Sequence, residues 1–289
     1  MKTWIVPILF YLFISGCSPI GTETGPPGPV TPEPLPSATR TEPSATIPPA
    51  SATPTSTPTD LPTVPPPTET PEIGLSVCSP LPDLLPSDLE DSITNPYNPP
   101  PFGSDDPHQG VDLANFLPGT RIGVGGGSVQ AVLAGTVSLV VADRFPYGNA
   151  VMVETPIEAL IAAGWAPSPL DEEIPILTTL TCPGETEIFA DSQRQSLYLL
   201  YAHLQDIPTL AVGEVVACGG PLGRIGDTGN ALNPHLHLEV RLGPSGAVFP
   251  GMSHYSAAAS AAEMDSYCIW RVGGQFRPVD PLLILGMME

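Results

Sequence analysis

The chain has 289 residues, of which 42% are hydrophobic, and its formal net charge is −21. It contains only 9 Lys and Arg residues against 30 Asp and Glu residues. Nucleic acid binding is therefore disfavoured, because the neutralisation of phosphates requires clustered basic side chains. The acidity instead favours solubility and weak self-association, so we expect a monomer.

Residues 1–16 have the features of a lipoprotein signal peptide. Lys2 is their only charge, and the apolar run from Trp4 to Ile14 is shorter than the roughly 20 residues that cross a bilayer. The run ends in ISGC, which resembles a bacterial lipobox and implies cleavage before Cys17 and a lipid on that residue. The alternative is an ordinary cleaved signal in which Cys17 is incidental.

A lipid on Cys17 would anchor the mature protein to the outer face of a membrane in the cell envelope. Ser18 follows the cysteine and resembles a signal for the outer membrane, if the cell has two membranes. We therefore expect a membrane-tethered protein.

Residues 17–77 are expected to form a disordered, lipid-anchored linker. From Gly21 to Val77 the sequence holds 16 prolines, 13 threonines and no aromatic residue. Such a segment cannot bury enough apolar surface to offset the entropy of the chain, and it favours extended polyproline-like conformers. The remaining residues 78–289 are ample for one hydrophobic core.

The folded domain is predicted to be all-β with decorated loops. Val-, Leu- and Tyr-rich strands are expected, separated by Gly, Pro, Asn and Asp, and residues 212–230 have the spaced glycines of short strands with tight turns. Two short helices are the only helical signal. The strands are predicted at 128–143, 149–155, 196–204 and 235–242, and the helices at 156–165 and 256–267.

The domain contains four cysteines, at 78, 182, 218 and 268. In an exported domain an even number indicates two disulfides, for which three pairings exist. Free buried thiols are the alternative. No C-x-x-C motif occurs, so a zinc site built from thiolates is poorly supported.

Two histidines lie one residue apart in the segment NALNPHLHLEVR, residues 230–241. On a strand, residues i and i+2 point to the same face, so His235 and His237 project together and Glu239 follows them. By itself this pair supports a metal site and a structural role about equally. The opposite face carries Leu236, Leu238 and Val240.

The remaining histidines form less regular signals. His108 and Asp112 would be roughly 13 Å apart on an ideal strand, but a bend at Gly110 could bring them to one point. A polar surface turn is the alternative. His203 ends an apolar strand in YAHL, a position that is more often structural, and His254 is interpreted as a loop residue.

Taken together, these motifs resemble the lysostaphin/LytM-type zinc endopeptidases of bacterial cell walls. HQGVD, YAHL, GRIGDTGN and HLHLE occur in the family's order, and YGNAVMVE and RPVDPLLIL also resemble family segments. The resemblance covers about residues 100–243 and 276–285. It implies an antiparallel, sandwich-like β-sheet domain of the duplicated hybrid motif type.

The resemblance also implies roles for five residues. His108, Asp112 and His237 match the ligands of a catalytic zinc ion (Zn2+), and His203 and His235 match the catalytic pair. Three protein ligands leave a fourth position open, as in catalytic zinc sites. Glu239 is left open between a partner that orients an imidazole and a carboxylate on the sheet surface.

Two segments depart from the family pattern. Residues 155–195 and about 244–275 are insertions, and they include Cys182 and Cys268 respectively. We expect both insertions to rim the substrate groove. Because disulfide bonds would limit the conformational entropy of these loops, the preferred pairings are Cys182 with Cys268 and Cys78 with Cys218.

The implied function is a tethered zinc metalloendopeptidase that hydrolyses peptide cross-links or bridges of bacterial peptidoglycan. The bond remains open between a D-alanine to diamino-acid cross-link and a glycine bridge. A LytM-like regulator that activates a cell-wall amidase without cutting is the main alternative, although such domains typically lack some ligands. An H-x-H jelly-roll metalloprotein is a third, which the order of the motifs disfavours.

Overall fold

The computed structural model describes residues 75–288, apart from 83, 102, 167–179 and 189. The predicted signal peptide, Cys17 and the linker up to residue 74 therefore lie outside the described residues. None of the helices in the described part is long and apolar enough to span a membrane.

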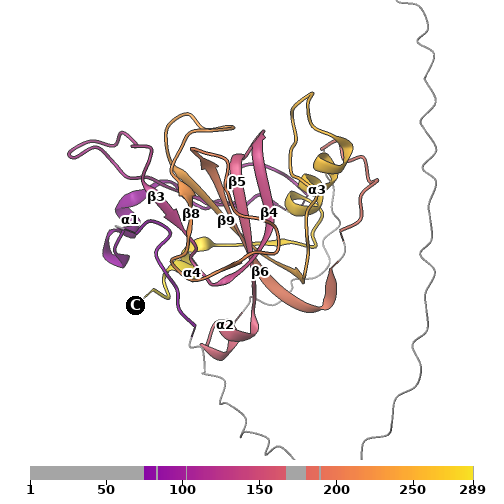
Figure 1. Ribbon diagram of the computed structural model, residues 1–289, viewed down its shortest axis with the longest axis horizontal. Helices are drawn as coiled ribbons and strands as arrows, with labels where there is room; N and C mark the ends of the chain where they lie inside the picture. Colours follow the sequence, from indigo (N-terminus) through magenta and orange to yellow (C-terminus); the bar gives the residue numbers. More distant parts are fainter. Residues whose placement is uncertain (1–74, 83, 102, 167–179, 189, 289) are drawn as a thin grey trace, which may run out of the picture. The chain divides into compact units, whose positions relative to one another are not determined.

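The described chain is mostly strand (Figure 1). Its strands are β1 (Ile93–Asn95), β2 (Val111–Leu113), β3 (Ser128–Gln130), β4 (Gly135–Arg144), β5 (Gly148–Pro156), β6 (Asp191–Leu204), β7 (Val215–Val216), β8 (Pro221–Arg224), β9 (Leu236–Ser245) and β10 (Arg277–Val279). Its helices are the 3-10 turn η1 (Pro86–Asp88) and the α-helices α1 (Leu89–Ser92), α2 (Glu158–Ala162), α3 (Ala261–Arg271) and α4 (Pro281–Leu285).

The large sheet has the order β1-β2-β9-β6-β5-β4-β7, with β10 beside β9, and β3 and β8 form a second, two-stranded sheet. Every strand pair is antiparallel, which confirms the predicted antiparallel β-sheet. Strand β9 pairs with β6 along one edge, while β2 and β10 share its other edge.

Alternation along the strands gives the large sheet two buried faces. One face packs Leu199, Tyr201 and Leu238 against Val129 of β3 and Leu222 of β8. The opposite face packs aromatic and aliphatic side chains of β5 and β6 against the segment that contains α3. In Figure 1, β3 and β8 lie to one side of the large sheet and α3 to the other. The second cluster includes Met152, Tyr198, Leu200, Phe249, Trp270 and Phe276.

The predicted strand 128–143 is wrong as one element, because it forms β3 and β4 in different sheets. Ala131, Val132 and Leu133 are buried between the two strands. A run of consecutive apolar residues has the same pattern whether it continues one strand or crosses between two layers. The sequence pattern therefore could not reveal the crossing.

Both predicted helices exist, but their bounds differ. The first is only the short α2, and the second begins later than expected, after Ser260. Ser260 and Glu263 form a capping box, in which each side chain bonds the other's backbone N–H. This S-x-x-E signal was present in the sequence and marks the true start of α3.

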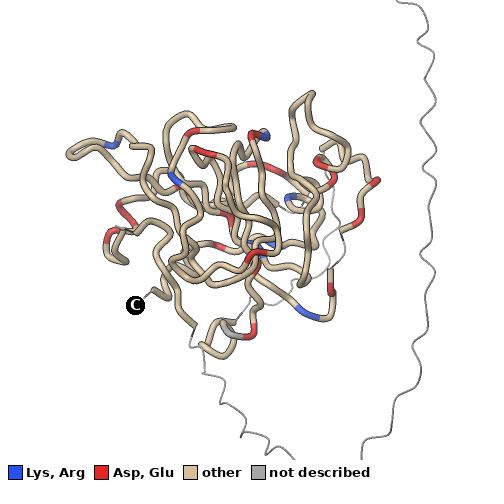
Figure 2. Tube along the Cα trace, in the orientation of Figure 1, with Lys and Arg blue, Asp and Glu red and all other residues tan. Residues whose placement is uncertain are grey.

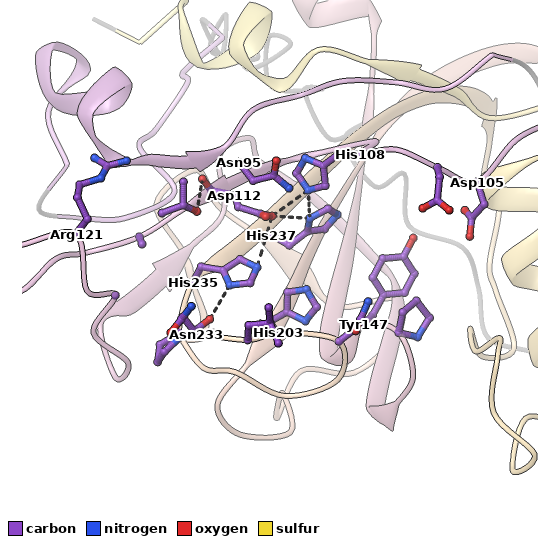
Figure 3. A pocket seen from close by; sticks show the side chains of 18 of the residues that line it. Asn95, Asp105, His108, Asp112, Arg121, Tyr147, His203, Asn233, His235 and His237 are labelled. Carbon is purple, nitrogen blue, oxygen red and sulfur yellow. Dashed lines mark hydrogen bonds and ion pairs between the residues drawn. The ribbon is translucent and has the colours of Figure 1, made fainter. Parts of the chain in front are cut away.

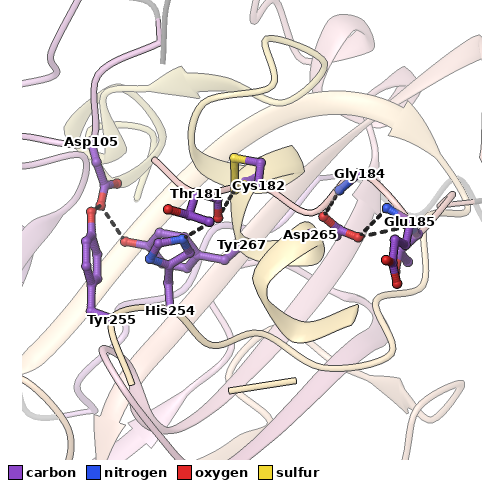
Figure 4. The surroundings of a disulfide bond; sticks show 11 residues. Asp105, Thr181, Cys182, Gly184, Glu185, His254, Tyr255, Asp265 and Tyr267 are labelled. Atoms are coloured by element: carbon purple, nitrogen blue, oxygen red, sulfur yellow. Dashed lines mark hydrogen bonds between the residues drawn. A yellow bond between two sulfur atoms is a disulfide. The ribbon is translucent and has the colours of Figure 1, made fainter. Parts of the chain in front are cut away.

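Two disulfides, Cys78–Cys218 and Cys182–Cys268, confirm the preferred pairing. The second one joins the two insertions, and further contacts reinforce it (Figure 4). The Asp265 carboxylate of α3 accepts hydrogen bonds from the backbone N–H groups of Gly184, Glu185 and Thr186. The insertions therefore form one braced unit on the α3 side of the sheet.

His254 lies in the loop before α3, as expected, but it is buried rather than exposed. Its Nε2 lies 3.0 Å from the carbonyl oxygen of Thr181, next to the disulfide (Figure 4). Its ring also packs against Tyr267 at a centroid distance of 5.2 Å. This histidine therefore belongs to the packing between the insertions.

The described charges are mostly acidic and are spread over the strands, helices and loops, with arginines at separate positions (Figure 2). Arg224 pairs with Asp206 and Arg194 with Asp191, and both pairs are exposed. Exposed pairs of this kind contribute little to stability, because water and salt screen them. The ion pairs of Arg271 in α3 with Asp105 and Glu239 are instead largely buried.

Replacing Cys182 and Cys268 together by Ser is expected to lower the free energy of unfolding by about 2–4 kcal/mol, because the open loop gains entropy in the unfolded chain. Chemical denaturation without reductant measures this difference. The matched Cys78→Ser/Cys218→Ser protein should lose at least as much, since its disulfide spans 140 residues rather than 86. An unchanged unfolding free energy in the first variant would contradict the assigned stabilisation.

Candidate metal centre

All five residues singled out in the sequence lie in one cavity of about 620 Å³ (Figure 3). His108 precedes β2 and forms an isolated bridge with Asn98, whereas Asp112 lies within β2. His203 is the penultimate residue of β6, His235 immediately precedes β9, and His237 lies within β9. Three separate segments of the chain thus contribute to one site.

The register of the sheet explains this convergence. Asp112 pairs directly with His237 across β2 and β9, and Ala202, next to His203, pairs with His237 across β6 and β9. Directly opposed residues in an antiparallel pair have Cβ atoms about 4.5–5.5 Å apart. The two neighbours of β9 therefore bring a carboxylate and a third imidazole to the strand that carries the H-x-H pair.

Three donor atoms face one another at the centre of the cavity. His108 Nε2 lies 3.2 Å from both Asp112 Oδ1 and His237 Nδ1, and the latter two atoms are 2.8 Å apart. Ligands about 2.0–2.1 Å from a tetrahedral zinc ion would be separated by about 3.3 Å. The group His108, Asp112 and His237 therefore fits the dimensions of a metal site.

The hydrogen bonds of His108 explain why this group favours a cation. Its Nδ1 lies 2.9 Å from the carbonyl oxygen of Pro96, which can only accept, so Nδ1 carries the proton. In the neutral ring, Nε2 is then a lone pair that points at the Asp112 carboxylate. Two electron-rich atoms at 3.2 Å require a proton or a metal ion between them.

The charges within the group act in the same direction. Burial raises the pKa of Asp112, but hydrogen bonds from His108 and His237 outweigh it and hold this pKa well below its usual range. Burial lowers the pKa of His237, yet hydrogen bonds and charges from Asp112 and Glu239 raise it to about 9. The site therefore binds positive charge strongly.

His203 and His235 border the donor group without joining it. Their ring centroids are 4.8 Å apart, and His235 Nε2 lies 3.5 Å from Asp112 Oδ1. Each Nδ1 meets a backbone carbonyl, that of Thr228 at 2.8 Å and that of Asn233 at 2.7 Å. Because a carbonyl can only accept, each Nδ1 is protonated and each Nε2 is left free in the neutral ring.

The backbone conformation and the protonation state of His203 are both unusual. Its φ of 61° is in the left-handed region, which a non-glycine residue adopts only under constraint from its surroundings. Burial and the nearby His237 and His235 lower its pKa to about 3, so its imidazole is neutral near pH 7. The fold thus holds a neutral, oriented imidazole at the edge of the site.

Glu239 is fully buried, so the interpretation as a surface carboxylate is wrong. Its Oε2 lies 3.6 Å from His237 Nε2, on the opposite side of the ring from the donor group. It also accepts a hydrogen bond of 2.9 Å from Tyr147. A carboxylate behind a metal-binding imidazole orients the ring and raises its basicity.

Sequence reasoning did not single out Tyr147, Arg241 or Arg271, which surround Glu239. Arg241 continues the two-residue alternation of His235, His237 and Glu239, so periodicity could have identified it. Arg271 lies in an insertion, where no family motif or spacing marks it.

The insertions contribute unequally to the cavity. Tyr267 and Arg271, from the second insertion, line it, in agreement with the expected rim. The described part of the first insertion contributes no lining residue. Described residues of the first insertion contact α3 instead. The cavity is also lined by Arg121, Ile122 and Leu232.

Gly110 is required for a reason other than the predicted bend. A Cβ atom at this position would lie 2.6 Å from the carbonyl oxygen of Leu238 and 2.7 Å from Cε1 of His237. Such distances are below normal van der Waals contact, so only glycine lets β2 approach the candidate ligand so closely.

Comparison with known proteins agrees with this geometry. The profile of Peptidase family M23 matches residues 185–249, which include His203, His235 and His237. This segment of the chain therefore resembles peptidase family M23. The candidate metal group of His108, Asp112 and His237 shares one residue, His237, with the matched segment. His108 and Asp112 lie outside the matched segment, and the pairing of β2 with β9 brings them to it.

Several solved structures resemble the chain. An M23 peptidase structure from Pseudomonas aeruginosa is 25% identical and covers 57% of this chain and 49% of its own, with a TM-score of 0.29. The catalytic domain of lysostaphin from Staphylococcus simulans is 18% identical and covers 70% of this chain and 95% of its own, with a TM-score of 0.36.

A zinc-containing peptidase from Vibrio cholerae is 21% identical and covers 51% of this chain and 32% of its own, with a TM-score of 0.29. The chain therefore spans about half of the Pseudomonas chain and about a third of the Vibrio chain. No curated protein matches it.

Replacing Gly110 by Ala is expected to displace His237 or the backbone at Leu238 and to weaken zinc binding at least about 10-fold, because ligand geometry sets affinity. Titration of the metal-free protein with zinc measures the effect. Gly119→Ala is the control: its φ of 74° costs stability, about 1 kcal/mol, but a Cβ there meets no atom within 4 Å. Equal zinc affinities in the two variants would contradict the role of Gly110.

Proposed function

We propose that this protein is a zinc endopeptidase that hydrolyses peptide cross-links or bridges of bacterial peptidoglycan. The observation that carries the proposal is the meeting of a His-Asp-His donor group with two further oriented imidazoles in one cavity. The family match supports a peptidase, and the complete set of five residues favours catalysis over regulation.

The proposed zinc ligands are His108 Nε2, Asp112 Oδ1 and His237 Nδ1. Two imidazole nitrogens and one carboxylate oxygen are a donor set that zinc accepts readily, and three protein ligands leave a position open. A zinc ion held there would polarise the scissile carbonyl and lower the pKa of a water molecule.

We assign the proton transfers to His203 and His235. Both rings donate from Nδ1 to a backbone carbonyl, so neither can rotate without losing that bond. Each free Nε2 can accept a proton from the attacking water or, once protonated, donate to the developing oxyanion or the leaving amine. The low pKa of His203, about 3, keeps this ring in the accepting state before reaction.

We further propose that the protein acts in the cell envelope, tethered through a lipid on Cys17 and a Pro/Thr-rich stalk. The two disulfides support a location outside the reducing cytoplasm. The lipobox-like ISGC supports the anchor. A long tether would let a domain fixed to the membrane reach cross-links at a distance from it.

Single alanine variants should separate the ligands from the proton-transfer residues. His203→Ala and His235→Ala are expected to keep zinc and lose about 10²–10⁴-fold in turnover, because general acid–base groups typically contribute that much. His108→Ala and His237→Ala should lose zinc and activity together. Mass spectrometry measures the zinc content of each variant. The hydrolytic activity of each variant is measured by mass analysis of the products released from directly cross-linked and from glycine-bridged peptidoglycan.

Full activity in His203→Ala and His235→Ala would show that the assignment of proton transfer is wrong. A wild-type protein that binds zinc but releases no product from either peptidoglycan would contradict the endopeptidase proposal. Stimulation of a cell-wall amidase by such a protein would favour the regulatory alternative.

Cys17→Ala is expected to release the protein from membranes or to prevent its processing, because stable anchoring requires the acyl chains that this cysteine would carry. Cell fractionation and mass analysis of the mature N-terminus measure the outcome. Unchanged membrane retention, with a mature N-terminus elsewhere, would contradict the anchor.

A further inference from the structure

The helix α3, which the second insertion contributes, ends at Arg271 beside the candidate metal site. The Arg271 side chain is only 10% exposed and makes three hydrogen bonds. Its Nη1 donates to Glu239 Oε2 at 3.0 Å, its Nε to Asp105 Oδ1 at 2.6 Å, and its Nη2 to the Asp105 carbonyl at 2.9 Å. One guanidinium thus bridges two carboxylates on different segments.

We propose that Arg271 is a positioning residue for the metal site, which holds Glu239 behind His237 and the segment of Asp105 beside His108. The inserted helix would then complete the site rather than only border the groove. The proposal rests on the proposed zinc-dependent function, but it concerns zinc binding and can be tested without substrate.

The contacts of Glu239 support the first half of the proposal. Its two oxygens are held separately, because Arg241 Nε donates to Oε1 at 2.6 Å while Tyr147 and Arg271 donate to Oε2. Oε2 is the atom that lies 3.6 Å from His237 Nε2. Arg271 therefore fixes the carboxylate oxygen that lies beside His237 Nε2, while Nδ1 of the same ring faces the other two donors.

The contacts of Asp105 support the second half. This residue lies three positions before His108, and its Oδ2 accepts hydrogen bonds from Tyr255 at 2.6 Å and Tyr267 at 2.7 Å. Arg271 binds its other oxygen and its backbone carbonyl. The start of the segment that carries His108 is thereby attached to α3 by side-chain and main-chain bonds.

Charge balance makes Arg271 difficult to replace. Glu239 is fully buried, and two arginine side chains, Arg241 and Arg271, form ion pairs with it. Loss of Arg271 would leave Glu239 with one arginine partner and would remove the charged partner of Asp105 in this network. A carboxylate that moves from this position can no longer orient His237.

The two insertions together hold Arg271 in place. Cys268, which forms the disulfide with Cys182, lies one helical turn before Arg271. The contacts of Asp265 with residues 184–186 fix the preceding turn of the same helix (Figure 4). The bracing of α3 therefore extends to the guanidinium that contacts the site.

The test is the zinc affinity of Arg271→Met, measured by competition with a chromogenic chelator on the metal-free full chain. We expect zinc to bind about 10–100-fold more weakly than in the wild type, the usual effect of losing a partner behind a metal ligand. Arg271→Lys keeps the charge but cannot reach both carboxylates in the same way, so it should recover only part of the affinity.

Arg144→Met is the matched control. Arg144 also binds α3, through Glu263 at 2.7 Å, but its side chain is 46% exposed and does not line the cavity. This variant should keep the wild-type zinc affinity. An unchanged affinity in Arg271→Met, or an equal loss in Arg144→Met, would overturn the proposal, because Arg271 would then act only on helix packing.

Misfolding of a variant and inactivity of the wild type are distinguished from failure of the Arg271 proposal as follows. If Arg271→Met does not fold, Arg271→Lys decides: zinc binding at least about 5-fold weaker supports the proposal, and wild-type affinity overturns it. If the wild type binds zinc but cuts no peptidoglycan, the endopeptidase proposal fails, while the affinity comparison still decides the role of Arg271.

Discussion

The hydrogen-bonded pairing of β9 with its neighbours is the constraint on which the site depends. β2 sets Asp112 opposite His237, and β6 ends so that His203 follows the residue paired with His237. A slip of one residue in either register would turn these side chains to the other face of the sheet. The buried leucines of β9 resist such a slip, because they would then leave the hydrophobic core. The same apolar alternation that stabilises the sheet thus also positions the donors.

The opposite face of β9 carries polar groups into the interior, and their charges have to be balanced there. His237, Glu239 and Arg241 follow one another on this face, and all three are buried. Burying an ionised group is costly unless charged partners and hydrogen bonds compensate. Arg241 supplies part of this compensation from the strand itself, and Arg271 supplies the rest from α3. The stability of the sheet interior and the orientation of the candidate ligand therefore depend on the same contacts.

Local strain and close packing are concentrated at the same place. Gly110 lets the backbone of β2 approach the His237 ring, and His203 adopts a left-handed backbone at the end of β6. Such features persist where the surrounding structure over-determines them, and here two sheet edges and the carbonyl of Thr228 do so. The insertions add disulfide-braced packing on the α3 side without altering the pairing of the central strands.

The sequence by itself determined what depends on local spacing: the strands around 149–155, 196–204 and 235–242, and the shared face of His235 and His237. The order of the motifs also selected the five residues that the fold brings into one cavity. It left Glu239 open, misjudged 128–143 as one strand and did not mark Arg271. Only the tertiary structure decided these points. Periodicity reports which face a residue occupies, whereas burial of Glu239, the crossing between sheets and the bridge from Arg271 to Asp105 depend on which distant segments pack together.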